Sequence, residues 1–412
     1  MNKEFFINNR KKFAEKMKDY SVAVFFSKEA PRESLDQSHK FVVDRNFFYL
    51  TGINKENMVL AISKVNGVVT EQLFIPPVNE TFEKWFGIVL RKEEAQEISG
   101  IQNIVDRDSF ESTLCSKLSS MDLFENLYIV TAYANMEEFD DEYRAIAKKV
   151  KNQLPSVNIL NSLGLMMELR VHKQPEEIEE VKTSIKYTKE ALEFLMKNMK
   201  PDMYEYQVRA HYEYQLMLRN SSPSFATIAA SGKSGVILHH VDLKNQIHDG
   251  ELVLCDLGAL SNMYASDITR TYPVNGKFTQ RQKDIYNIVL GAQDVTMDIM
   301  KPGISEIDVN NAVIKYFAKE LKAIKLISDD SEVSKYYYHS VGHPLGLDLH
   351  DLRCRDRKMA ENNIYTVEPG LYIAEEGIGI RIEDDVLVTK NGNINLSKDI
   401  IKTVNDIENF MK

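Results

Sequence analysis

The strongest constraint on the fold of this chain is an aspartate that directly follows the apolar residues Leu252–Cys255, within Gly250–Asp256 (GELVLCD). Because side chains alternate along a strand, Leu252, Leu254 and Asp256 share one face of the strand that this run predicts. An ionised carboxylate among apolar side chains is costly unless it is paired or binds a metal. A second aspartate, Asp267, follows in another predicted strand. Either aspartate alone is more simply explained as a residue that caps a turn.

Three histidines lie close together in the sequence, at His339, His343 and His350, whereas the whole chain has 9. Gly342 and Gly346 between them allow a close approach of the backbone. Neutral imidazole is the commonest metal ligand and can also serve as an acid or a base. A polar loop with hydrogen-bonded histidines explains the cluster equally well.

Two glutamates lie in strand-like runs near the C-terminus. Glu368 is followed by Pro-Gly, which places it where a strand enters a turn. In the later run GIGIRIEDDV the isoleucines face one way, whereas Gly379, Arg381 and Glu383 face the other. A small residue, a guanidinium and a carboxylate on one face suit the floor of a site. The alternative is a surface salt bridge on an edge strand, which the alternating glycine disfavours.

Together these clusters offer carboxylate oxygens and an imidazole, a donor set that suits Mn²⁺, Co²⁺, Fe²⁺ or Zn²⁺. Four carboxylates carry a charge of about −4 at neutral pH, which two divalent ions balance. Two metals a few ångströms apart can lower the pKa of a shared water to near neutrality. The candidate ligands therefore predict a dinuclear centre.

Residues 20–160 alternate short apolar runs with charged, helix-like stretches. This alternation predicts an α/β layer domain, and no nucleotide-binding glycine motif occurs in it. The predicted strands are Ser21–Phe26, Met58–Ser63, Gln72–Ile75 and Asn126–Thr131, and the predicted helices are Lys92–Ile98 and Met136–Lys151.

A boundary is expected within Asn161–Pro175, which Gly164 and Pro175 punctuate. We therefore expect an N-terminal α/β domain over 1–162 and an α+β domain over 163–412. From Phe225 onward the second domain reads as strands, turns and glycines interrupted by helices. Its predicted helices are Glu176–Asn198, Met203–Arg219, Gln280–Met300 and Glu306–Ala323.

The formal net charge of −10 argues against broad nucleic-acid binding, which needs clustered Lys and Arg. No apolar run approaches the roughly 20 residues of a membrane-spanning helix, and no leader or transit segment is visible. The three cysteines, Cys115, Cys255 and Cys354, lack paired spacing. They fit a reducing compartment, so we expect a cytoplasmic protein.

The ordered set of candidate ligands resembles the metal site of the "pita-bread" metallopeptidases, a group that includes methionine aminopeptidase, prolidase and aminopeptidase P. SDITRTYPVNGKFTQRQKDIYNIVL, TVEPGLYI and GIGIRIEDDVLVT are similar to aminopeptidase P and prolidase. RNFFYLTGINKENMVLAI and ETFEKWFG resemble the N-terminal domain of bacterial aminopeptidase P. The resemblance covers nearly the whole chain, and the set is Asp256, Asp267, His343, Glu368 and Glu383.

The resemblance implies a role for each matching residue. Asp256 would bind one metal, Asp267 and Glu383 would bridge both, and His343 and Glu368 would complete the other. Glu368 would also be the general base. His239 would lie near the scissile carbonyl, and its neighbour His240 would take that role if the match were shifted by one residue. His350 would stabilise the oxyanion. Arg381 would lie beside the prolyl end of the site.

The implied activity is that of a manganese Xaa-Pro aminopeptidase, which removes the N-terminal residue from peptides with proline second. Prolidase, a dipeptidase with the same chemistry, is the closest alternative. A metal-free binding module on the same fold is a further one, disfavoured by the intact ligand set. Departures from the family pattern at Ser340, Pro344 and Phe225 leave the leaving-group pocket, and the preferred peptide length, open.

Trp85 is the only tryptophan, in the run EKWFG of the N-terminal domain. A lone tryptophan is more often a core residue, because its burial contributes strongly to packing. The resemblance implies instead that Trp85 reaches across an interface and forms a wall of the partner's active site. We therefore expect a homodimer or homotetramer, in agreement with the prevalence of symmetric assemblies.

Overall fold

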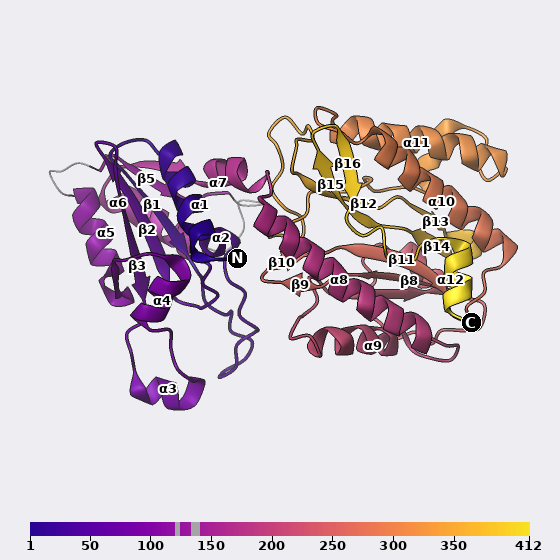
Figure 1. Ribbon diagram of the computed structural model, residues 1–412, viewed down its shortest axis with the longest axis horizontal. Coiled ribbons are helices and arrows are strands. Elements are labelled where there is room, and N and C mark those ends of the chain that lie inside the picture. The colour runs from indigo at the N-terminus through magenta and orange to yellow at the C-terminus, as the bar shows by residue number, and fades with distance from the viewer. Residues whose placement is uncertain (120–123, 133–140) are drawn as a thin grey trace. The chain divides into compact units, whose positions relative to one another are not determined.

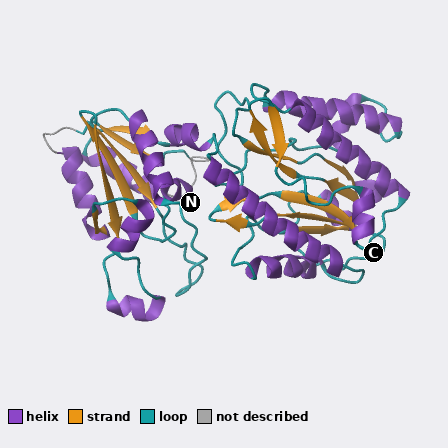
Figure 2. Cartoon of the chain, in the orientation of Figure 1, coloured by secondary structure: helices purple, strands orange, loops and turns teal. Residues whose placement is uncertain are grey.

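The computed structural model describes residues 1–119, 124–132 and 141–412, and it divides the chain into two compact units (Figure 1). The first unit is Met1–Arg170 and the second is Val171–Lys412. Both units mix helices with strands (Figure 2). Among the described residues, no helix is both long enough and apolar enough to cross a membrane.

The first unit is built on a six-stranded sheet with the strand order β4-β3-β2-β1-β5-β6. Strands β3, β2 and β1 pair antiparallel, whereas β4, β5 and β6 join their neighbours in parallel. The mixed sheet agrees with the alternation of apolar and helix-like segments. The strands are β1 (Ser21–Phe26), β2 (Val59–Val65), β3 (Val68–Ile75), β4 (Ile104–Asp106), β5 (Asn126–Ile129) and β6 (Asn158–Asn161).

Aromatic side chains fill the core on one face of this sheet. The ring of Phe26 packs edge-on against Phe110 and Tyr143, with centroids 5.6 and 4.9 Å away. These two rings belong to α5 (Phe110–Ser119) and α6 (Glu142–Gln153), so both helices pack on that face. The other helices of the unit are α1 (Lys3–Lys16), α2 (Arg45–Thr51), α3 (Glu80–Phe86), α4 (Lys92–Ser99), α7 (Leu163–Arg170) and the 3-10 turn η1 (Arg107–Ser109).

Strand β3 begins four residues before the predicted Gln72–Ile75. Its first residues are exposed and lack an apolar alternation, and they are held instead by a tight hairpin with β2. Asn66 and Gly67 form that turn with φ of 49° and 77°, the left-handed conformations that a two-residue hairpin requires. Residues 136–140 of the predicted helix Met136–Lys151 lie outside the described residues, and its remainder corresponds to α6.

The division between the units falls after Arg170, eight residues beyond the expected boundary at 162. Helix α7 packs on α1 of the first unit. Arg170 Nη1 donates to Oδ1 of Asn46 at 2.8 Å, and the Tyr49 hydroxyl donates to the Leu169 carbonyl at 3.4 Å. These contacts join residues far apart in sequence, which a local pattern does not reveal.

The second unit opens with α8 (Pro175–Asn198), which lies beside α9 (Glu205–Met217). Pro175 occupies the first turn, and Gln174 with Glu177 forms a capping box, so the helix begins one residue before the predicted Glu176. Helices α10 (Gln280–Ile299) and α11 (Glu306–Ala323) also lie where the sequence placed them. The remaining helical segments are α12 (Val404–Phe410), η2 (Gly232–Val236), η3 (Asp330–Lys335) and η4 (Ala374–Glu376).

Short antiparallel strands carry the candidate site residues of this unit. One sheet has the order β11-β8-β7, a second the order β12-β15-β16, and a hairpin joins β13 to β14. The strands are β7 (Ile228–Ser231), β8 (Leu252–Leu257), β9 (Leu260–Ser261), β10 (Tyr264–Ala265), β11 (Ile268–Pro273), β12 (Ile364–Val367), β13 (Gly370–Ile373), β14 (Ile378–Arg381), β15 (Asp384–Thr389) and β16 (Gly392–Asn395).

A close backbone contact joins β14 to η2. A Cβ atom on Gly379 would lie 1.9 Å from the carbonyl oxygen of Gly235. Because real Cβ atoms do not approach backbone oxygens so closely, only glycine permits this contact. The same requirement explains why glycine alternates with isoleucine along β14.

Candidate metal centre

The strand ends of the second unit bring the five predicted ligands together. Asp256 lies in β8, where it pairs with Thr269 of β11, and Asp267 stands one residue before β11. Glu368 directly follows β12, as its Pro-Gly signal predicts, and Glu383 directly precedes β15. The fifth member of the set, in the loop before β12, is His343.

The donor atoms of this set converge on one point. His343 Nε2 lies 3.4 Å from Oδ2 of Asp267 and 3.6 Å from Oε1 of Glu368. Ligand atoms of Asp267, His343 and Glu383 all lie within 4.8 Å of one another. These separations bring several lone pairs to a shared position, as a cation site requires.

Three carboxylate oxygens in this cluster are buried without a hydrogen-bond partner. They are Oδ1 of Asp256, Oδ1 of Asp267 and Oε1 of Glu383. Buried polar atoms in folded proteins almost always have a partner, so each orphan requires an explanation. Oxygens of this kind, with an imidazole beside them, are the ligands that divalent cations of the Mn²⁺ class accept. The residues therefore fit a bound metal.

Neighbouring groups orient these ligands. His343 Nδ1 faces the Pro344 carbonyl at 3.0 Å, so a proton there leaves Nε2 free to accept. Thr269 Oγ1 donates to Oε2 of Glu383 at 2.6 Å. Thr366 Oγ1 accepts the His343 backbone N–H at 3.0 Å and lies 3.3 Å from Oε1 of Glu368.

The electrostatics of the cluster without a cation are unfavourable. Burial, followed by the charges of Asp256 and Glu368, raises the pKa of Asp267 well above its usual range. Burial and then Asp267 do the same to the pKa of Glu383. Burial also raises the pKa of Glu368, although His343 opposes that shift. A divalent charge reverses each of these penalties.

Arg381 is buried behind the cluster and contacts a candidate ligand directly. Its Nη2 donates to Oδ2 of Asp256 at 2.6 Å, its Nη1 donates to the Tyr372 hydroxyl at 2.9 Å, and its side chain is 4% exposed. The Nε atom reaches Thr269 Oγ1 at 3.1 Å. In this position Arg381 holds Asp256 in place.

The two adjacent histidines have different surroundings. His240 Nε2 lies 2.9 Å from Oε2 of Glu205, whose side chain is fully buried. His239 is exposed, and its charge acts on both His339 and His350. The environment of His239 is therefore that of the site, whereas His240 belongs to a polar cluster next to it.

The other histidines of the cluster also lie at the site. The His350 ring meets His343 edge-on with centroids 4.2 Å apart, and burial followed by the charge of His343 lowers the pKa of His350. His339 Nε2 lies 2.8 Å from the Tyr372 hydroxyl. Burial, and then the charge of Arg381, lowers the pKa of His339 to about 4, so this imidazole is neutral at physiological pH.

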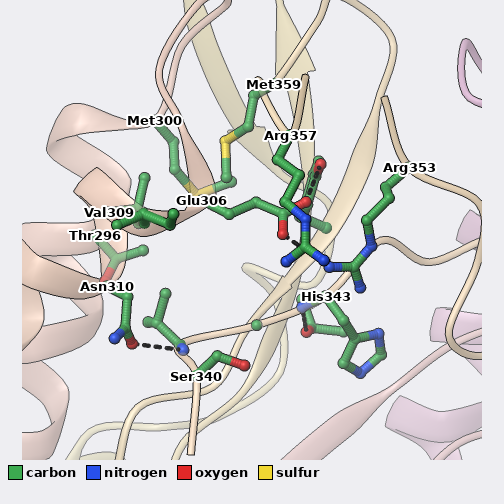
Figure 3. Close-up of a pocket in the computed structure, with 15 residues that line it drawn as sticks. Thr296, Met300, Glu306, Val309, Asn310, Ser340, His343, Arg353, Arg357 and Met359 are labelled. Carbon is green, nitrogen blue, oxygen red and sulfur yellow. Dashed lines mark hydrogen bonds and ion pairs between the residues drawn. The ribbon is translucent and has the colours of Figure 1, made fainter. Parts of the chain in front are cut away.

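A cavity of about 220 Å³ borders the His343 segment (Figure 3). Oε2 of Glu306 accepts from Arg353 Nη1 at 2.9 Å, and its Oε1 accepts from the Tyr365 hydroxyl at 3.0 Å. Asn310 Oδ1 accepts the Val341 N–H at 3.1 Å, as the dashed line in Figure 3 marks. These contacts tie the chain on either side of His343 to α11.

Sequence reasoning missed several supporting residues. Thr269 shares a strand face with Asp267, so its spacing could have revealed it. Asp385, whose Oδ2 accepts the Asp267 N–H at 3.2 Å, lies two residues after the candidate ligand Glu383. Tyr372 carried no local signal, because only the fold brings it to Arg381 and His339.

Trp85 is not a core residue of its unit. Its side chain is 80% exposed on α3, next to Phe86 at 75% and Ile88 at 75%. Three exposed apolar side chains together mark an interaction surface more often than an ordinary solvent face. The general expectation that a lone tryptophan is buried is therefore wrong for this chain.

Comparison with known proteins gives matches along the whole chain. A model of metallopeptidase family M24 matches residues 179–390, and a model of the aminopeptidase P N-terminal domain matches residues 6–150. The Xaa-Pro aminopeptidase of Escherichia coli (strain K12) is 30% identical over 432 residues, covering 100% of this chain and 98% of that protein. Xaa-Pro aminopeptidase 3 of Homo sapiens is 30% identical over 398 residues, covering 91% and 78%.

Solved structures match equally well. A Bacillus anthracis structure assigned to aminopeptidase P superimposes with a TM-score of 0.97 at 44% identity, covering 100% of this chain and 98% of that one. Zn-substituted Escherichia coli aminopeptidase P in complex with product superimposes with a TM-score of 0.92 at 30% identity and the same coverage.

Proposed function

The chain belongs to metallopeptidase family M24, and we propose that it removes the N-terminal residue from peptides whose second residue is proline. The relatives named Xaa-Pro aminopeptidase match it over essentially its whole length. The expected architecture, an α/β N-terminal domain followed by a pita-bread catalytic domain, is confirmed. The observation that carries the proposal is the group of orphaned carboxylate oxygens around His343.

Two divalent ions are the cofactors that this ligand set fits. Asp256 would hold one, His343 and Glu368 the other, and Asp267 and Glu383 would bridge them. When bound, such ions polarise a carbonyl and lower the pKa of water. We propose Mn²⁺ as the native metal, because oxygen donors outnumber the single imidazole, with Co²⁺ and Zn²⁺ as alternatives.

Different side chains of the site transfer protons and stabilise charge. Glu368 takes a proton from the attacking water and returns it to the prolyl nitrogen. His239 and His350 donate hydrogen bonds to the oxyanion that develops on the scissile carbonyl. Arg381 keeps Asp256 oriented throughout. Proline is selected because its tertiary amide has no N–H and its ring fixes φ.

Assembly of more than one chain would complete the substrate cleft. We propose a homodimer or homotetramer in which Trp85 forms a wall of the partner's site. Its exposure on α3, with Phe86 and Ile88 beside it, supports this role. A cytoplasmic location also stays a proposal, supported by three cysteines that are all unpaired.

A comparison of matched peptides tests the function. Mn²⁺-loaded protein should release alanine from Ala-Pro-Ala and leave Ala-Ala-Ala largely intact. The Asp256→Asn variant, prepared in the same way, controls for contaminating peptidases. Cleavage of Ala-Pro but not of Ala-Pro-Ala would identify a prolidase instead. No cleavage of any of the three, with two metals bound, would leave a binding module as the better explanation.

A further inference from the structure

A buried ion pair lies outside the metal centre, between Lys173 and Asp351. Lys173 Nζ is 2.9 Å from Oδ2 of Asp351, and each side chain is 1% exposed. Two charges removed from water in this way carry a large desolvation penalty, which their attraction offsets only when the geometry is good. A pair of this kind is weak evidence for stability and raises the question of what it holds in place.

The backbone around the pair is packed against it. A Cβ atom on Gly346 would lie 2.4 Å from Oδ2 of Asp351 and 2.7 Å from Cε of Lys173. The missing side chain at position 346 therefore makes room for the ion pair. Gly346 is also fixed from its other side, because its carbonyl accepts the Ala265 N–H at 2.9 Å.

Asp351 connects the pair to His343 and His350. It directly follows His350, and its backbone N–H donates to the Pro344 carbonyl at 2.9 Å. That same carbonyl faces Nδ1 of His343 at 3.0 Å. The Pro344 carbonyl thus contacts both ends of the segment 343–351. His343 is the first residue of this segment, and His350 is the last but one.

Lys173 approaches this segment from a fixed position. Its backbone N–H donates to the Asn362 carbonyl at 2.8 Å, and two residues earlier the Val171 carbonyl accepts from Asn363 Nδ2 at 2.9 Å. Glu177 lies nearby on α8, and burial raises its pKa to about 7. The ammonium group of Lys173 lowers the pKa of Glu177 and the charge of Asp351 raises it, so the three groups interact electrostatically in this buried region.

We propose that Lys173 and Asp351 are positioning residues that hold the His350 imidazole against His343, in the orientation that the reaction uses. This inference rests on the function proposed above, because His350 is assigned there to the oxyanion. In the contacts described above, the side chains of Lys173 and Asp351 meet each other and the backbone at Gly346, and the link to His350 runs through the backbone of Asp351. Their effect on turnover is therefore exerted through His350.

The test starts from Lys173→Met, which keeps the length of the side chain and removes its charge. With Ala-Pro-Ala as substrate, we expect kcat to fall on the order of 10- to 100-fold, the scale of an ångström-size misplacement, while KM changes little. Metal content should equal that of the unaltered protein. Lys283→Met is the matched control, because it breaks the 2.9 Å pair with Glu408 far from this segment in sequence.

Two further variants separate positioning from stability. In a His350→Ala background, Lys173→Met should lower kcat no further, because coupled residues are not additive. In Lys173→Met the Asp351 carboxylate stays buried without the Lys173 ammonium group. The double variant Lys173→Met/Asp351→Asn removes that charge, so its Tm should be higher than that of Lys173→Met while its kcat stays low. A kcat that recovers together with Tm, an additive loss in the His350→Ala background, or a loss of bound metal would each overturn the proposal.

A spectroscopic readout keeps the test independent of the assigned function. In Zn²⁺-loaded protein with ¹⁵N-labelled histidine, the His350 imidazole resonances should shift in Lys173→Met and stay unchanged in Lys283→Met. Unshifted resonances would overturn the inference. If the unaltered protein cleaves no peptide but these resonances move, the positioning role stands and the proposed function fails.

Discussion

Nη2 of Arg381 donates to Oδ2 of Asp256 at 2.6 Å, so a buried guanidinium is part of the candidate metal centre. The other oxygen of that carboxylate, Oδ1, has no partner. Oδ2 of Asp256 is thus held by Arg381, and Oδ1 is available to a cation. Because Arg381 fixes the carboxylate that would bind the cation, changes at Arg381 should alter metal affinity.

Arg381→Lys should lower metal affinity about 10- to 100-fold, the usual range for groups that orient a ligand. Lysine keeps the charge, but it lacks the planar guanidinium group that donates to Asp256 and Tyr372 at the same time. Competition with a chelating dye measures the affinity. Arg281→Lys, which alters a pair in which Nε and Nη2 of Arg281 each donate to one oxygen of Glu376, should leave the metal affinity unchanged. Equal affinities for both variants would contradict a role for Arg381 in orienting Asp256.

Metal-free protein should become less stable as the pH rises. The pKa values of Asp267 and Glu383 are raised in the folded state, so their contribution is fully present below the ordinary carboxylate range, about pH 4. It is lost as the pH rises through the raised values. Thermal unfolding of chelator-treated protein should show Tm falling from about pH 5 to about pH 8.

Added Mn²⁺ should raise Tm most at the alkaline end of that range, where the ligands have lost their protons. The metal-free Asp267→Asn/Glu383→Gln variant should show a flatter dependence of Tm on pH. A Tm of the metal-free protein that rises steadily with pH would contradict the carboxylate repulsion described here.

Glu368→Gln should reduce kcat about 10²- to 10⁴-fold, the typical contribution of a general base. Because Glu368 is also a candidate ligand, bound metal must be measured on the same sample. Glu320→Gln, on the surface of α11, serves as the control. A Gln variant that is active with a full complement of metal would show that another residue takes the proton.

His239→Ala and His240→Ala should have opposite effects. Loss of His239 should lower kcat/KM without changing Tm, because its side chain is exposed at the site. Loss of His240 should lower Tm and leave kcat/KM nearly intact, because its partner Glu205 is fully buried. Calorimetry and peptide hydrolysis on both variants decide between them, and a reversed pattern would exchange the two assignments.

Trp85→Ala should raise KM or lower kcat while Tm and metal content stay the same, since the side chain is 80% exposed. Sedimentation velocity on the same samples reports whether the assembly is weakened. The control is Leu35→Ala, a residue that is 91% exposed on the same unit. A fully active monomer would remove any role for Trp85 in a partner's site.

Local patterns predicted those elements whose signals are local. The bounds of α11 were predicted without error, and α8 begins one residue before its predicted start because a proline and a capping box mark that point. Glu368 was placed at a strand end by the Pro-Gly that follows it. The start of β3 was missed although Asn66–Gly67 is a strong hairpin signal, because its first residues are exposed and not alternating.

Contacts between distant parts of the chain could not be predicted in this way. Lys173 and Asp351 are separated by most of the second unit, and each alone reads as an ordinary surface charge. The same applies to Arg381, whose strand face was recognised but whose partner, Asp256, lies on a different strand. Such pairs are set by the fold, and sequence periodicity carries no information about them.

The backbone contact between Gly379 and Gly235 affects how mutational scans of this enzyme are interpreted. No side chain fits at position 379, so every replacement there distorts β14 beside Arg381 and Glu383. Lost activity after such a replacement has the same outward appearance as the loss of a ligand. A loss of activity on replacing Gly379 therefore shows that β14 and η2 must pack closely. It gives no information about which groups contact the substrate.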